Sequence, residues 1–223
     1  MKRVLVVVAH ADDEVLGCGG AILRHVECGD DVHVVYMTDG VGARGGDLSV
    51  EAACRVESRN RALEILGVEN SYAFDFPDNK MDSVPLLDVI QPLEKILKEV
   101  RPDTVYTHHC GDLNVDHRLT NQAVITACRP LPGSSIRNIL TFEVMSSTEW
   151  NCSGFMDFIP NVYIDIADYL RRKCDALEAY DLEMRPAPHS RCIDHVKHLA
   201  RHRGYSVGLS AAEAFIAVRE IIN

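Results

Sequence analysis

Three residues near the start of the chain carry side chains that bind metal ions or move protons: His10, Asp12 and Asp13. A further histidine, His117, follows much later. Two imidazoles and one carboxylate, from His10, Asp13 and His117, form a ligand set that leaves one coordination position open for water, as in catalytic zinc sites. Zinc lowers the pKa of such a water, so that hydroxide forms near neutral pH. Asp12 lies beside a ligand and is the candidate general base.

The competing interpretation is that these side chains take no part in chemistry. Histidines at the ends of strands are more often structural or solvated, and short motifs match by chance. Metal binding is favoured because a second cluster of histidine and aspartate, at residues 108–117, follows another predicted strand.

The segments that must position these residues alternate between strand and helix patterns. Residues 4–8 form a continuous apolar run rich in β-branched side chains, which is typical of a buried central strand of a parallel sheet. The alternation predicts strands at 4–8, 32–37, 72–76 and 104–107, and helices at 16–28, 49–66, 86–100 and 116–128. Because the carboxyl ends of parallel strands lie at one edge of a sheet, His10 and His117 are expected to meet there.

The rest of the chain is expected to extend this α/β architecture. The patterns predict strands at 139–144 and 161–165, helices at 167–182 and 193–203, and a last segment at 211–221 that is either a helix or a strand with a turn. The sequence shows no internal repeat or linker, so we predict one domain over residues 1–223. The predicted class is α/β with a mainly parallel central sheet.

The composition is that of an ordinary globular protein and limits the partners. The 223 residues are 47% hydrophobic and 25% charged, and no apolar run approaches membrane-spanning length. The net charge of −10 argues against a general affinity for nucleic acid. The start of the chain lacks a signal-peptide pattern, and none of the eight cysteines forms a CxxC pair. We therefore expect a cytoplasmic protein with reduced cysteines.

Five segments of the chain resemble motifs of one family. Residues 9–14, AHADDE, resemble the AHPDDE motif of the PIG-L/LmbE-like zinc-dependent de-N-acetylases. Residues 112–120, DLNVDHRLT, resemble the second motif of that family. Further resemblance lies, in the same order as in the family, in RVESRNRALEILGV, DFPDN and HRGYSVGLSAAEAF. The resemblance therefore covers essentially the whole chain.

The resemblance implies a fold, a metal and a reaction. The implied fold is Rossmann-like, with three layers and no nucleotide. The implied metal is Zn²⁺, or another divalent metal such as Fe²⁺, on His10, Asp13 and His117, with Asp12 as general base. The implied substrate is an N-acetylated amino sugar of the GlcNAc type, carried on an alcohol, a lipid or a small metabolite and hydrolysed to acetate and a free amine. Members of the family often form trimers or hexamers, so a homo-oligomer is possible.

The resemblance also implies residues beyond the metal ligands. Arg55 matches an arginine that contacts substrate, and Asp78 matches an acidic position near the sugar hydroxyls. Glu213 is expected to orient an arginine or a ligand histidine. From the second motif, Asn114 and Asp116 are predicted to belong to the catalytic group, with Asp116 also able to cap the following helix. Three arginines in predicted loops could hold a phosphate or carboxylate of the substrate: Arg44, Arg185 and Arg191.

Two positions depart from the pattern of the family. Ala11 replaces a proline, which loosens the loop slightly. Asn114 replaces a histidine that stabilises the oxyanion or protonates the leaving amine. Asparagine can donate a hydrogen bond to an oxyanion but delivers no proton at neutral pH. The acid could then be Asp12 or a histidine from elsewhere, with His109 and His189 as candidates that also contact substrate.

Two other functions are compatible with the sequence. The first is a zinc amidohydrolase with a different N-acylated substrate, such as an aminoglycoside, a glycopeptide or an amino acid. The second is a sugar- or nucleotide-binding protein of the same fold without catalysis. The presence of His10, Asp12, Asp13 and His117 together argues against the second function.

Overall fold

The structure is a computed structural model that describes residues 1–38, 40, 48–152, 154 and 156–222, with the side chains of residues 48–51 left out. The strands are β1 Arg3–Val8, β2 Asp31–Thr38, β3 Asn70–Phe76, β4 Thr104–His108, β5 Asn138–Phe142, β6 Val162–Asp165 and β7 Ala212–Glu220. The α-helices are α1 Asp13–Glu27, α2 Leu48–Leu66, α3 Leu86–Val100, α4 Val115–Ala127, α5 Leu170–Glu178 and α6 Ile193–Tyr205. Two short 3₁₀ helices are η1 Met81–Ser83 and η2 Thr148–Trp150.

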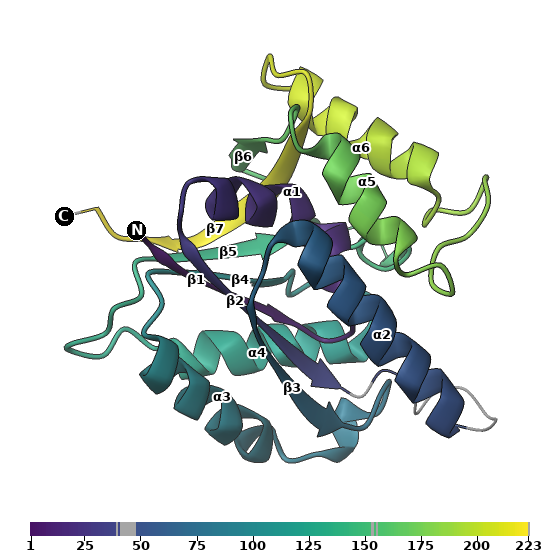
Figure 1. Cartoon of the computed structure of the whole chain (residues 1–223). Helices are drawn as coiled ribbons and strands as arrows, with labels where there is room; N and C mark the ends of the chain where they lie inside the picture. The colour runs from purple at the N-terminus through teal and green to yellow at the C-terminus, as the bar shows by residue number, and fades with distance from the viewer. Residues whose placement is uncertain (39, 41–47, 153, 155, 223) are drawn as a thin grey trace.

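The seven strands form one sheet in the order β3-β2-β1-β4-β5-β7-β6. The first five strands pair in parallel, and β7 runs antiparallel to both β5 and β6. Helices α1, α2, α5 and α6 cover one face of this sheet, and α3 and α4 cover the other (Figure 1). The prediction of an α/β fold with a mainly parallel sheet is therefore confirmed.

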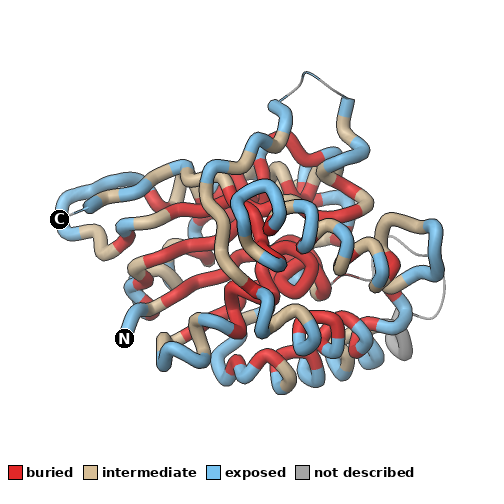
Figure 2. The backbone as a smooth tube through the Cα atoms, turned by 90° about the horizontal axis from the view of Figure 1, so that it is seen from above, coloured by how far each residue is buried: buried red, intermediate tan, exposed pale blue. Residues whose placement is uncertain are grey.

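The central strand β1 explains why its sequence is apolar without interruption. Val4, Val6 and Val8 contribute to the core under α1, α2, α5 and α6, whereas Leu5 and Val7 contribute to the core under α3 and α4. Because the sheet is covered on both faces, each of these side chains is buried (Figure 2).

The strand order places a crevice between β1 and β4. From β1 the chain continues to β2 and β3 on one side, and it then crosses to β4 and β5 on the other. Loops that leave adjacent strands in opposite directions open a crevice at the carboxyl ends of these strands, where ligands bind in open α/β sheets. Residues 9–13 follow β1 and residues 109–117 follow β4, so the two clusters of polar side chains lie at this crevice.

Helix α1 begins earlier than the sequence predicts, at Asp13, and is broken at Cys18, whose φ is −147°. A buried ion pair from the last third of the chain covers the break. Lys173 of α5 donates to the carbonyl oxygen of Leu16 at 2.9 Å and to Glu213 Oε1 of β7 at 2.6 Å. The two Glu213 oxygens accept the amides of Gly20 and Ala21 at 2.8 and 2.7 Å. These contacts replace helix hydrogen bonds lost at the break.

Three further elements differ from the prediction or decide between its alternatives. Segment 211–221 is strand β7, because it pairs with β5 and β6 on its two sides. Helix α5 spans Leu170–Glu178 rather than 167–182. Helix α3 continues through Pro92. Among the described helices, none combines the length and the apolar character needed to cross a membrane.

Candidate metal centre and adjoining cavity

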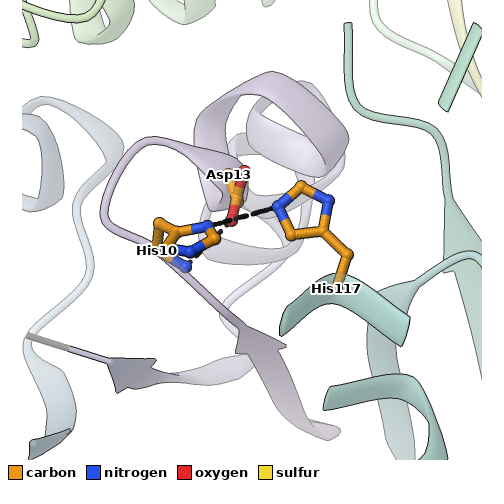
Figure 3. A group of neighbouring side chains, drawn as sticks. All are labelled: His10, Asp13 and His117. Atoms are coloured by element: carbon orange, nitrogen blue, oxygen red, sulfur yellow. Dashed lines mark hydrogen bonds and ion pairs between the residues drawn. The ribbon is translucent and has the colours of Figure 1, made fainter. Parts of the chain in front are cut away.

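Three side chains converge at the carboxyl ends of β1 and β4: His10, Asp13 and His117 (Figure 3). His10 Nδ1 lies 3.2 Å from Asp13 Oδ2 and 3.2 Å from His117 Nε2. His117 Nε2 lies 3.3 Å from Asp13 Oδ2. His10 comes from the turn after β1, Asp13 from the first turn of α1, and His117 from the first turn of α4, and all three are buried.

The triangle of ligand atoms fits a metal ion. In a tetrahedral zinc site with bonds of roughly 2.0–2.1 Å, ligand atoms lie about 3.3–3.4 Å apart, close to the three distances here. Asp13 Oδ1 is buried and has no hydrogen-bond partner among the described residues, which is costly unless another group pairs with it. His10, Asp13 and His117 therefore could hold a metal ion and leave its fourth position open to the cavity.

The electrostatics of the three residues favour a bound cation. Burial lowers the pKa of His117, but the carboxylates of Asp13 and Asp112 outweigh it and raise the pKa to about 9. Burial likewise opposes the charge on His10, yet Asp116, Asp13 and Asp78 raise its pKa well above the usual value. The surrounding carboxylates thus favour positive charge at the position of these two imidazoles. A metal ion must displace any proton on the ligand nitrogens, because only neutral histidine is a ligand.

Each ligand histidine has a carboxylate on its other ring nitrogen. Asp112 Oδ1 lies 3.2 Å from His117 Nδ1, and Asp116 Oδ2 lies 3.1 Å from His10 Nε2. These carboxylates accept the second ring N–H and so turn the opposite nitrogen toward the metal position. Asp116 also accepts the amides of Asn79 and Met81, at 2.6 and 3.1 Å, and is absent from the described cavity wall. We interpret Asp116 as a positioning residue for His10.

Asp112 is a residue that the sequence reasoning missed. Besides His117 it accepts the hydroxyls of Ser147 and Thr148 and, at 2.8 Å, the amide of Asn114. Burial raises the pKa of this carboxyl, but the contact with His117 outweighs burial and lowers it below the usual range. Asp112 lies in the same motif, DLNVDH, as the ligand His117, and this position could have indicated its role from the sequence. Asp112 thus joins a metal ligand to the segment before η2.

Asp12 occupies the edge of the cavity beside the ligand triangle. Its φ of 124° is rare for a residue with a side chain, and it turns the backbone between His10 and Asp13. Arg191 contacts Asp12 Oδ2 through Nη1 at 2.5 Å. Burial raises the pKa of Asp12, Arg191 partly opposes this, and the resulting pKa is about 6. The carboxylate is therefore ionised at neutral pH and still close enough in pKa to accept a proton.

Glu14 holds the strained turn from inside the core. Its Oε2 accepts the amide of Asp12 at 3.1 Å, and its Oε1 accepts the hydroxyl of Tyr180 at 2.5 Å. Burial raises the pKa of Glu14 to about 7, although its hydrogen bonds moderate the rise. Tyr180, just after α5, thereby reaches the N-terminal motif.

A cavity of about 260 Å³ adjoins the ligand triangle. Apart from Trp150, its lining residues are polar or charged, and eight of them, Arg185 included, were predicted from the sequence to take part in the site. The described lining residues are His10, Asp12, Arg55, Asp78, Asn79, Asn114, Ser146, Trp150, Glu183, Arg185, His189 and Arg191.

Asn114 and Arg55 are each held by a partner in the wall. Asn114 Oδ1 accepts the amide of Asp116 at 2.8 Å, which caps α4, and its Nδ2 donates to Asn79 Oδ1 at 3.2 Å. Arg55 of α2 contacts Glu183 Oε1 at 2.5 Å. Asn114 thus presents a donor to the cavity, and Arg55 presents a fixed cation.

Besides Asp116, two predicted residues outside the ligand triangle, His109 and Glu213, do not line the described cavity. His109 turns away, and its Nε2 lies 2.6 Å from the carbonyl oxygen of Met156. Its neighbour His108 faces the centre instead, with its ring 3.9 Å from that of His117. Glu213 contacts Lys173 and helix amides rather than an arginine or a ligand histidine. Arg44 lies outside the described residues.

Residues of the wall that sequence reasoning missed are Asn79, Ser146, Trp150 and Glu183. Asn79 lies within the DFPDN segment, which was the available signal for it. The other three lie in irregular segments without a motif, so nothing local marked them.

The sequence model of the family PIG-L, described as GlcNAc-PI de-N-acetylase, matches residues 5–128. The uncharacterized deacetylase YaiS of Escherichia coli (strain K12) is 31% identical over 185 residues, 80% of this chain and 90% of YaiS. The 4-oxalmesaconate hydratase of Pseudomonas putida is 34% identical over 127 residues, 53% of this chain and 48% of the hydratase.

A solved structure with the same fold is N,N′-diacetylchitobiose deacetylase from Pyrococcus horikoshii, in complex with its inhibitor MPG. The TM-score is 0.80 at 24% identity, and the match covers 98% of this chain and 84% of the other. This likeness identifies the fold as LmbE-like and Rossmann-like.

Proposed function

Because the chain belongs to the PIG-L family of de-N-acetylases, we propose that it hydrolyses the N-acetyl group of an amino sugar of the GlcNAc type. The observation that carries this proposal is the ligand triangle of His10, Asp13 and His117 beside the carboxylate of Asp12, in one polar cavity. The products would be acetate and a free amino sugar.

We propose zinc as the metal, because two imidazoles and one carboxylate with an open position are a common catalytic zinc set. A zinc ion held there supplies a Lewis acid and lowers the pKa of a water molecule to near neutrality. Another divalent metal such as Fe²⁺ would bind the same nitrogen and oxygen ligands.

Asp12 would accept a proton from the attacking water as the water oxygen bonds to the acetyl carbonyl carbon. Arg191 keeps the Asp12 carboxylate in place at the cavity edge through a contact of 2.5 Å. Asn114 Nδ2 carries two hydrogens and donates one to Asn79. The other can be donated to the carbonyl oxygen as that oxygen gains negative charge.

Protonation of the leaving amine falls to a group in the cavity wall. Asp12 can return the proton that it received, because its raised pKa makes it a usable acid. His189 also lines the cavity and is the second candidate. His109 is absent from the described wall and contacts the carbonyl oxygen of Met156, so we propose Asp12 and His189 for this role.

The cavity wall suits a hydroxylated ring. Asp78 and Arg55 place a carboxylate and a guanidinium at the same opening as the ligand triangle. Groups of this kind hydrogen-bond sugar hydroxyls and fix the orientation of a small ligand. The cavity, of about 260 Å³, is of the size class that takes a small molecule.

A second candidate function is hydration of an unsaturated carboxylic acid. The hydratase relative from Pseudomonas putida and the arginines of the wall, Arg55, Arg185 and Arg191, favour it. Guanidinium groups pair well with carboxylates. Hydration adds water to a double bond and releases no acetate, so the two reactions differ in their products.

The test is acetate release by zinc-loaded protein from a panel of N-acetylated compounds: GlcNAc, N,N′-diacetylchitobiose, GlcNAc α-glycosides, N-acetylated aminoglycosides and N-acetyl amino acids. Asp12→Ala should bind zinc and lose most turnover, and His117→Ala should lose the metal in elemental analysis. Arg129→Ala, at an exposed surface ion pair with Glu94, is the matched control. Metal-loaded protein that releases acetate from no compound of the panel would overturn the proposal.

A further inference from the structure

We propose that Trp150 forms a second sugar-binding position at the rim of the cavity, where it stacks on a ring linked to the N-acetylated sugar. The inference rests on the proposed function and narrows its substrate class to amino sugars that carry a second ring. Trp150 is the sole tryptophan of the chain.

The first argument is the placement of an apolar surface in a polar wall. Among the described lining residues, Trp150 is the one large apolar side chain, and the others are charged, amide, imidazole or hydroxyl groups. Its exposed fraction is 53%. Aromatic side chains commonly line ligand sites together with polar groups that fix the orientation of the ligand. A pyranose ring has a face of C–H groups that fits an aromatic surface.

The second argument is that Trp150 belongs to a segment fixed to the catalytic machinery. Asp112, which contacts the metal ligand His117, also accepts the hydroxyls of Ser147 and Thr148 just before Trp150. The residues just before Trp150 are thus held relative to the ligand triangle. A rigid aromatic surface loses little conformational entropy when it binds a ring.

A further set of contacts ties this segment to the loop that carries His189. Glu149 accepts the amide of Ser146 at 2.7 Å and the hydroxyl of Ser190. The ring of His189 meets the indole edge-on, with centroids 5.8 Å apart and planes at 78°. The edge contact leaves a face of the indole free of His189.

The third argument is position. His10 and Asp12 are buried, whereas Trp150 lines the same cavity and is half exposed, so the indole lies where the cavity opens to solvent. A ring attached to a sugar at the ligand triangle would extend toward this opening, where Trp150 stands.

The test uses a one-ring and a two-ring substrate, GlcNAc and N,N′-diacetylchitobiose. Trp150→Ala should lower the ratio of kcat/KM for the two-ring over the one-ring substrate by about tenfold, the effect of losing one aromatic contact. Trp150→Phe should keep most of this ratio. Leu131→Ala, an exposed apolar residue of another loop and not part of the described wall, is the control and should leave both values unchanged. An unchanged ratio in Trp150→Ala would overturn the inference.

A binding measurement separates this inference from the proposed function. Because Trp150 is the sole tryptophan, its fluorescence reports directly on the rim. In zinc-loaded Asp12→Asn protein, the two-ring sugar should change the emission in a saturable way, and GlcNAc should change it far less. If the emission responds selectively while no wild-type acetate release is found, the subsite is supported and the deacetylase proposal fails.

The opposite result, acetate release with no selective response of the emission, would overturn the subsite and leave the deacetylase proposal intact. A Trp150→Ala protein whose sedimentation shows a changed oligomeric state and whose substrate ratio is unchanged would assign the exposed indole to a contact between copies of the chain. This outcome would likewise overturn the inference.

Discussion

Replacement of Asp112 by asparagine tests how the outer carboxylates support the metal centre. Asparagine keeps the shape of the side chain and can still accept from His117 Nδ1 with its carbonyl oxygen, but it removes the negative charge. The negative charge of Asp112 beside Nδ1 raises the basicity of His117 Nε2, the nitrogen that would bind the metal. Partners of this kind typically contribute 10–100-fold to metal affinity. We therefore expect the zinc dissociation constant of Asp112→Asn to rise by roughly 10–100-fold.

The remaining contacts of Asp112 predict that the variant folds. Thr148 Oγ1 faces Oδ2 at 2.6 Å, and a hydroxyl can accept from the new amide group as well as donate. Asp112 Oδ1 takes the contacts from His117, Ser147 and the amide of Asn114, and the carbonyl oxygen of asparagine can retain them. Circular dichroism and the midpoint of thermal unfolding should thus stay close to those of the wild type.

The assay is competition for zinc between the protein and a chelator of known affinity, at constant pH. Ser147→Ala is the matched control, because it removes a neighbour of Asp112 and keeps the carboxylate. It should change the zinc dissociation constant much less than Asp112→Asn does. A natively folded Asp112→Asn protein with wild-type zinc affinity would refute the argument that Asp112 tunes His117.

Three further predictions concern proton transfer, the oxyanion and the core. Because Asp12 must be ionised to act as a base and its pKa is about 6, kcat/KM should fall as the pH drops through about 6 and level off above it; a profile without this limb would contradict the assignment. Asn114→Ala should lower kcat by roughly 10²–10³-fold if its amide donates to the oxyanion, at unchanged zinc content in elemental analysis. Lys173→Met should destabilise the protein by about 3–5 kcal/mol in urea unfolding, since it leaves Glu213 as an unpaired buried charge. The double variant Lys173→Met/Glu213→Gln should lose less than the sum of the two single variants, and additive losses would refute the pairing.

The sheet could be predicted wherever burial on both faces made the sequence pattern unambiguous. The apolar run of β1 and the strand–helix alternation that follows it depend on local sequence alone. Segment 211–221 was ambiguous, because alanine and glutamate favour helices while its phenylalanine, isoleucine and valine favour strands. Its state is decided by pairing with β5 and β6, which lie far away in the sequence.

In the candidate site too, local motifs could be predicted from the sequence, whereas contacts between distant residues could not. The ligand residues stand in two short motifs at strand ends, so their types and spacing could be read locally. The pairing of Asp12 with Arg191 joins residues 179 positions apart, and no local pattern indicates it. The choice between His108 and His109 depends on which side of the chain faces the crevice at the end of β4. Adjacent residues there point to opposite sides, and the sequence does not say which is inward.

The break in α1 bears on how small a working version of this protein can be. Residues 1–128 contain every ligand of the metal triangle and the whole segment matched by the family sequence model. Yet Lys173 and Glu213, which bridge the break beneath the ligand turn, come from beyond that point, as do Tyr180 and Arg191, which hold Glu14 and Asp12. A truncated chain would thus keep the metal ligands and lose the contacts that hold them in position. Substitutions in the last third of the chain should therefore be tolerated only where they preserve these contacts with the opening motif.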